Sequence, residues 1–167
     1  SGNNVLNQET ITLNFTTSGG GGGGGGTGDL PSGHVINMNP VTGDTVPNGT
    51  AVNTGSSYPE KTTSVAFKTA SDVTTRQVIY EQGGSSRGLI FYLENGTLIS
   101  RAWNLAEENW GPKVVTKSVS GNTDYVATMV LDGVKAETGT MKVYLDGTQV
   151  GSRTGVGILY AHSNGNG

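Results

Sequence analysis

The chain has 167 residues, of which 33% are hydrophobic, only 14% are charged and 28 are glycine. Its length suits one domain with a hydrophobic core. Runs of Lys, Glu and Ala that would build a long helix are scarce, whereas Thr and Val suit pleated strands and Gly and Asn supply turns. The formal net charge is −3 and no cluster of Lys or Arg occurs, which excludes the usual electrostatic footprint of a nucleic-acid-binding protein. The composition therefore predicts an all-β protein.

Two absences exclude further classes of site. The sequence has no cysteine, so disulfides, thiolate metal ligands and a cysteine nucleophile are ruled out. No apolar run approaches the roughly 18 residues that a transmembrane helix needs, so we expect no membrane insertion. The sequence starts at Ser1 without a methionine, which fits either a mature form whose signal peptide has been removed or an engineered expression product. We expect an extracellular or cell-surface location, with a virion appendage as the alternative.

The first elements in chain order are a strand and a glycine run. In Glu9–Thr16 the apolar residues Ile11, Leu13 and Phe15 alternate with polar ones, which is the period of a half-buried strand. Eight consecutive glycines follow at Gly19–Gly26. Because glycine loses the most backbone entropy on ordering, this run predicts a flexible tether, with a surface loop inside one domain as the alternative.

We therefore divide the chain into a tethered strand, residues 1–28, and a main domain, residues 29–167. The first part of the main domain is rich in proline and turn pairs, with short strands expected at His34–Met38 and around Val52. Further on, the strand signal is clear. Strand-like runs fall at Ser64–Lys68, Gln77–Gln82, Leu89–Leu93, Thr97–Trp103, Lys113–Ser118, Tyr125–Leu131, Met141–Leu145, Gln149–Arg153 and Gly157–Ala161.

Turn signals connect these runs. Asn95-Gly96 and Asp146-Gly147 each separate two runs by two residues that tolerate positive φ, as in a primed hairpin turn. In Tyr125–Leu131 both faces carry apolar residues, so this strand is expected in the middle of a sheet. Eight or nine short strands separated by such turns indicate a sandwich or a barrel.

Seven short sequence motifs follow one another in order between Phe67 and Asn166. They are Phe67–Thr69, Arg76–Gly84, Arg87–Leu89, Asn95–Leu98, Ala102–Asn104, Tyr144–Thr148 and Leu159–Ser163. In this order and spacing the chain resembles the laminin-G-like group of the concanavalin-A-like lectin/glucanase superfamily. The resemblance implies an antiparallel two-sheet jelly-roll sandwich whose concave face or loop rim binds glycans or proteins, in some members through calcium.

The chain departs from this group at its end. Members normally continue past the region of Ala161 and His162 into strands that complete the sandwich, whereas this sequence stops at Gly167. A fragment, further residues beyond the end, or completion by another strand would each explain the difference. The tethered strand with Ile11, Leu13 and Phe15 is a candidate to complete the sheet, in its own domain or in a neighbouring subunit. In a neighbour it would satisfy an exposed sheet edge and link subunits into a polymer.

The catalytic pattern of the superfamily's glucanases is missing. Such enzymes need paired carboxylates that face the same way along a strand. Glu107 and Glu108 are adjacent and lie in a loop-like segment, while His34 and His162 have no partner motif. We therefore predict that the chain is not an enzyme. We expect no cofactor except, as an option, calcium, for which the sequence defines no ligand set.

An aromatic, polar segment is the candidate ligand-binding site. Aromatic faces stack on sugar rings, while amide and carboxylate groups hydrogen-bond sugar hydroxyls. The residues predicted to bind are Trp103, Asn104, Glu107, Asn109 and Trp110. The alternative is that both tryptophans belong to the core or hold the loop in place.

A second group of charged residues is expected to be structural. Glu81 and Arg87 flank the turn Gln82–Ser86, which predicts an ion pair that clasps a hairpin, with Arg76 able to share that role. Taken together, the patterns predict a non-catalytic recognition or adhesion module of an exported or surface-displayed protein, with a glycan or surface-protein ligand. The alternative is a structural subunit of an extracellular fibre or virion appendage, assembled by exchange of the N-terminal strand.

Overall fold

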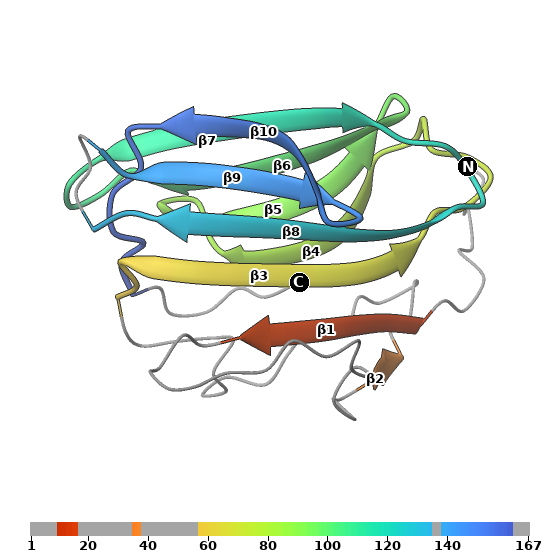
Figure 1. The fold of residues 1–167 in the computed structure, drawn as a ribbon, viewed down its shortest axis with the longest axis horizontal. Helices are drawn as coiled ribbons and strands as arrows, with labels where there is room; N and C mark the ends of the chain where they lie inside the picture. The colour runs from red at the N-terminus through yellow and green to blue at the C-terminus, as the bar shows by residue number, and fades with distance from the viewer. Residues whose placement is uncertain (1–9, 17–34, 38–56, 135–137, 162–167) are drawn as a thin grey trace.

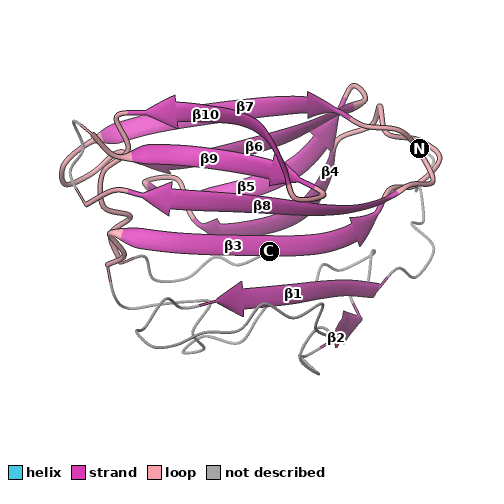
Figure 2. Ribbon diagram, in the orientation of Figure 1, coloured by secondary structure: helices cyan, strands magenta, loops and turns pink. Residues whose placement is uncertain are grey.

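Figure 1 shows the computed structural model of the chain, which describes residues 10–16, 35–37, 57–134 and 138–161. These residues contain strands and no helix, and therefore no helix that could cross a membrane (Figure 2). The strands are β1 (Thr10–Thr16), β2 (Val35–Asn37), β3 (Glu60–Lys68), β4 (Gln77–Gly83), β5 (Arg87–Glu94), β6 (Thr97–Asn104), β7 (Trp110–Ser118), β8 (Asp124–Asp132), β9 (Thr140–Leu145) and β10 (Thr148–Thr154).

The strands form two antiparallel sheets that pack face to face. One sheet has the order β10-β9-β8-β3-β1-β2 and the other the order β4-β5-β6-β7. In Figure 1 the strands β8, β9 and β10 lie in front of the second sheet, and β10 packs against β7 where the two sheets meet. The predicted two-sheet jelly-roll sandwich is confirmed, as is the central place of β8, which lies between β3 and β9.

Alternate residues of β3, β5, β6, β8 and β9 fill the space between the sheets. In β5 the buried inward residues are Leu89, Phe91 and Leu93, and in β8 they include Met129 and Leu131. Removing one such side chain from water contributes about 1.5–3 kcal/mol to folding. The period-2 pattern of the sequence therefore decides which face of each sheet is the core face.

β4 contains one extra residue that shifts the alternation of its side chains between the two faces of the sheet. Val78 and Tyr80 pair with successive residues of β5, which leaves Ile79 without a partner there. Such a β-bulge shifts the alternation of side chains by one position. As a result Val78 and Glu81, three residues apart, both belong to the outer face of this sheet.

The two predicted hairpin turns are confirmed. Asn95 and Gly96 have φ values of 51° and 70°, and Asp146 and Gly147 have φ values of 51° and 76°. Positive φ at both central residues is the signature of the primed turn whose twist matches that of paired strands.

The strand predicted at Glu9–Thr16 is β1, which lies beside β3 of the same chain (Figure 1). Its register pairs Leu13 with Val65, Phe15 with Thr63 and, on β2, Ile11 with Ile36. The strand expected at His34–Met38 is β2, which covers its middle three residues. The glycine run and the region around Val52 lie outside the described residues.

The run at Gly157–Ala161 is not a strand, contrary to the prediction. Only Leu159 forms a bridge, through two backbone hydrogen bonds of 2.8 and 3.0 Å with Tyr58. Two other carbonyl groups of this run accept hydrogen bonds from the side chains of Trp110 and Arg87. Because side chains take these acceptors, the segment joins no sheet ladder, and its buried Leu159 packs in the core.

Replacing Gly88 with alanine should destabilise the sandwich, because β5 has no room there for a side chain. An added Cβ would lie 2.4 Å from the backbone oxygen of Gln82 and 2.9 Å from the indole of Trp103. We expect urea denaturation to show a loss of about 1–3 kcal/mol in the free energy of unfolding. The matched control is Gly84→Ala, where nothing lies within 4 Å of the new Cβ. Equal losses in both variants would contradict this packing argument.

Lys61 should make stability rise with pH in alkaline solution. Its ammonium lies 4.8 Å from the ring centroid of Tyr58, and burial lowers its pKa from 10.5 to about 8. Below pH 8 both states hold the proton, whereas between pH 8 and 10.5 only the unfolded chain does, so stability increases across this window. Against Lys61→Met, the parent chain should gain at most about 3 kcal/mol between pH 7 and 10.5 in urea denaturation. A stability difference that does not change with pH would contradict the burial of this group.

Candidate functional site

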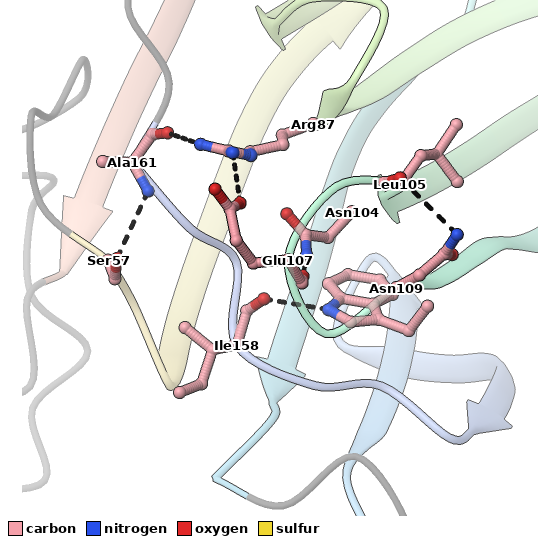
Figure 3. Close-up of polar contacts among 9 residues, drawn as sticks. Ser57, Arg87, Asn104, Leu105, Glu107, Asn109, Ile158 and Ala161 are labelled. Carbon is pink, nitrogen blue, oxygen red and sulfur yellow. Dashed lines mark hydrogen bonds and ion pairs between the residues drawn. The ribbon is translucent and has the colours of Figure 1, made fainter.

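The connection from β6 to β7 is anchored to neighbouring segments by polar contacts (Figure 3). Asn104, the last residue of β6, donates from Nδ2 to the backbone oxygen of Glu107. The Glu107 carboxylate forms an ion pair with Arg87 at the start of β5. The N–H of Leu105 donates to the backbone oxygen of Ser86 at 2.7 Å. The connection is therefore held to both the β4–β5 turn and β5.

The Arg87 guanidinium joins three segments. Besides the ion pair with Glu107, Nη1 donates to the backbone oxygen of Ala161 at 2.6 Å. The same guanidinium lies 6.0 Å from the ring centroid of Tyr160. Partial loss of hydration and then the neighbouring Glu108 carboxylate raise the pKa of the Tyr160 hydroxyl. Arg87 thus links β5, the β6–β7 connection and the segment after β10.

Both tryptophans have their indole N–H groups bound inside the fold. Trp110 is 4% exposed and donates from Nε1 to the backbone oxygen of Ile158 at 2.9 Å. Trp103 is 7% exposed and donates from Nε1 to the backbone oxygen of Gly84 at 2.9 Å. Trp110 belongs to the core between the sheets, whereas Trp103 does not. The indoles therefore hold the C-terminal segment and the β4–β5 turn.

The residues predicted to bind a ligand are divided between these environments. Asn104 is fully buried, and its Oδ1 has no hydrogen-bond partner among the described residues. The Glu107 side chain is 61% exposed, and Asn109 is exposed too. Ligand binding by this set stays a prediction, and its solvent-facing members are Glu107 and Asn109 rather than the two tryptophans.

The predicted ion pair between Glu81 and Arg87 is replaced by the pair of Arg87 with Glu107. The ladder places Glu81 opposite Ile90, on the outer face of the sheet. Arg87 alternates with Leu89 on the inner face, so its side chain leaves the sheet on the opposite side from Glu81. Arg76, which was expected to share the clasp, stacks on a tyrosine ring instead, as described next.

The outer face of the β4–β7 sheet brings together residues that the sequence patterns placed in two separate groups. These are Arg76, Glu81 and Trp103, and they are joined by Val78, Tyr92 and Arg101, which were not expected to belong to a site. The guanidinium carbon of Arg101 lies 5.3 Å from the centroid of Trp103, and that of Arg76 lies 4.6 Å from the centroid of Tyr92. Adjacent rows across β4, β5 and β6 are Val78–Tyr92–Ile99 and Glu81–Ile90–Arg101. We call this surface the arginine face and define it by Arg76, Val78, Glu81, Tyr92, Arg101 and Trp103.

The two guanidinium groups of the arginine face have unused hydrogen-bond donors. Among the described residues, neither Arg76 nor Arg101 has a hydrogen bond or an ion pair, and the buried Nε of Arg101 is without a partner. Aromatic rings hold arginine in place from one side and leave its N–H groups pointing along the edge of the guanidinium plane. These donors are available to an oxygen-rich ligand.

A sequence signal for this face exists in β6. Its alternation separates Arg101 and Trp103 from Leu98, Ser100 and Ala102. The second set is buried against the opposite sheet, so the larger, charged and aromatic residues must point outward. Trp103 and Ile90 are both buried without belonging to the core between the sheets, because neighbours on the outer face cover them.

Metal binding was expected only as an option, without ligands. No group of three or more His, Asp or Glu side chains that could hold a metal ion occurs within residues 57–134 and 138–161. Calcium binding remains an untested prediction. His34 and His162 lie outside the described residues.

No family model matches the chain, and no curated protein matches it. Among solved structures it is similar to the endo-β-1,4-glucuronan lyase from the fungus Trichoderma reesei, with a TM-score of 0.44 and 19% sequence identity. The match covers 64% of this chain and 52% of the lyase, so the chain spans about half the length of that enzyme. A likeness this weak transfers no residue roles and no activity.

The comparison corrects one prediction. We predicted that the chain is not an enzyme, and the similar solved structure is that of an enzyme. This finding contradicts the prediction, so a non-catalytic role is not carried forward, and no activity is assigned to the chain either.

Arg87 should matter more for stability than its ion-pair partner. Arg87→Ala removes the donor to Ala161 and the link between three segments, so we expect a loss of on the order of 1–3 kcal/mol in the free energy of unfolding. Glu107→Ala removes only one carboxylate of an exposed pair and should cost less than about 1 kcal/mol. Urea denaturation of both variants checks this order. Equal losses in the two variants would contradict this order, because they would show that the ion pair alone, and not the bond to Ala161, holds the junction.

Proposed function

We propose that the chain is a laminin-G-like recognition module of an exported or surface-displayed protein, and that it binds carbohydrate across the arginine face. The observation that supports this proposal is the pair of stacked guanidinium groups, Arg101 on Trp103 and Arg76 on Tyr92, with no acceptor among the described residues. Arg76 is exposed and Arg101 is partly exposed, so water solvates their N–H groups in the free protein, and the oxygen atoms of a ligand can replace that water.

The chemistry of the arginine face suits a sugar ring. A sugar presents hydroxyl oxygens around its rim and patches of C–H on its faces. The arginine face offers N–H donors from Arg76 and Arg101, a carboxylate acceptor at Glu81 and exposed apolar surface at Val78. Donors, an acceptor and apolar contact on one flat surface are the elements that orient a polar ligand.

The donors are also held in place before a ligand arrives. Each guanidinium rests against an aromatic ring that projects from a paired strand, so little side-chain freedom remains to be lost on binding. Sites built on strands hold their geometry better than sites on loops. This favours the arginine face over the β6–β7 connection as the main contact surface.

The proposal can be tested with an array of immobilised neutral and acidic oligosaccharides, followed by calorimetric titration of the strongest binder. Arg101→Met and Tyr92→Ala should each weaken binding by about tenfold or more, which corresponds to about 1.4 kcal/mol. The matched controls are Lys142→Met and Tyr144→Ala, which alter the outer face of the other sheet and should leave binding unchanged.

Two results would contradict the proposal. One is the absence of binding to every oligosaccharide on the array. The other is loss of binding in Glu107→Ala and Asn109→Ala while Arg101→Met binds normally, which would move the site to the β6–β7 connection.

A further inference from the structure

The ladder between β1 and β3 attaches the N-terminal part of the chain to the sandwich. β1 pairs with β3 at five successive positions, from Thr12 opposite Ala66 to Thr16 opposite Thr62. On its other side β1 pairs only with the short β2. In the described sheets β1 and β2 therefore form a unit that has a single ladder to the rest of the molecule.

β3 depends on a partner at this edge. Its other edge is fully paired with β8 from Glu60 to Lys68, and its inward side chains Thr63 and Val65 are completely buried. Without β1, the second edge of β3 would present unpaired backbone N–H and C=O groups next to the core. Such an edge is a template for any strand that matches it.

The sequence between these elements does not force β1 to pair with β3 of its own chain. Residues 17–34, which include Gly19–Gly26, connect β1 to β2, and residues 38–59 connect β2 to β3. Fully extended, the second connection can span at most roughly 75 Å. That reach exceeds the diameter of about 40 Å that is expected for a domain of this length, so a neighbouring copy is within range.

We propose that β1, with β2 along its outer edge, pairs with β3 of a second copy of this chain. The exchanged ladder would use the same five positions as the ladder within one chain, so no backbone hydrogen bond is lost by the exchange. Its cost is then mainly the entropy of association, as in domain swapping. When each copy lends its strand to the next one, the contact is head-to-tail and builds a chain of subunits.

The absence of cysteine allows a clean test by disulfide trapping. Asn14 lies opposite Ser64 in the ladder, and directly paired residues have the Cα separation that a disulfide requires. Ser64 is partly exposed and differs from cysteine only in its oxygen atom, so the replacement removes one hydrogen bond with Thr128 and leaves the ladder in place. Two full-length variants, Asn14→Cys and Ser64→Cys, are mixed, incubated at high concentration and oxidised.

The mixture should give a covalent dimer on a non-reducing gel, because each single variant can form this bond only with the other. The double variant Asn14→Cys/Ser64→Cys should give a ladder of covalent multimers. The control is Asn14→Cys mixed with Lys68→Cys, because Lys68 is exposed but lies four residues further along β3, roughly 13 Å away. This mismatched mixture should give no dimer above the level of each variant alone.

Three results would overturn the proposal. A double variant that is trapped only as a monomer, with no dimer in the matched mixture, would show that β1 stays in its own chain. Equal dimer in the matched and mismatched mixtures would show random contact. No disulfide in any sample would show that β1 and β3 do not pair as the ladder requires.

Discussion

Burial of one face of each sheet against the other is the constraint from which the remaining features follow. Since side chains alternate along a strand, a residue committed to the core sends both of its neighbours outward. In β6 the buried positions of Leu98, Ser100 and Ala102 leave Arg101 and Trp103 no other place than the outer face. The same constraint separates Glu81 from Arg87. The arginine face and the Arg87 junction are thus two consequences of one packing requirement.

The sequence predicted local features well because their causes are local. Asn95-Gly96 and Asp146-Gly147 specify their turns through the positive φ values that these residues tolerate. Apolar residues on both faces of β8 correctly predicted that this strand lies in the middle of its sheet. The start of β3 was predicted four residues too late, because Glu60–Thr63 lacks simple alternation although its backbone is paired with β8. Pairing with a distant strand is invisible in a short window of sequence.

The candidate site was harder to predict because its contacts join distant parts of the chain. Arg87 forms its ion pair with Glu107, which is twenty residues further along the chain. Glu81 is nearer in sequence and carries the same charge as Glu107, but its side chain lies on the opposite face of the sheet from Arg87. The segment Gly157–Ala161 had the composition of a strand, and its carbonyl acceptors were taken by Trp110 and Arg87. Residue type indicated which groups would be polar anchors, and only the fold decided what they anchor.

The bulge at Ile79 has a consequence for how this protein could vary. The side chains of β4 alternate between the two faces of the sheet, and Ile79 is one extra residue in this alternation. The residues after Ile79 are therefore shifted by one position relative to a regular strand. Deleting that single residue would remove the bulge and the buried Ile79 side chain, but it would leave Val78 and Glu81 on the outer face and the fully buried Gln82 on the inner one. The bulge therefore lets β4 absorb a single deletion, whereas a single deletion within the regularly paired β5 would exchange the inner and outer faces of the residues beyond it.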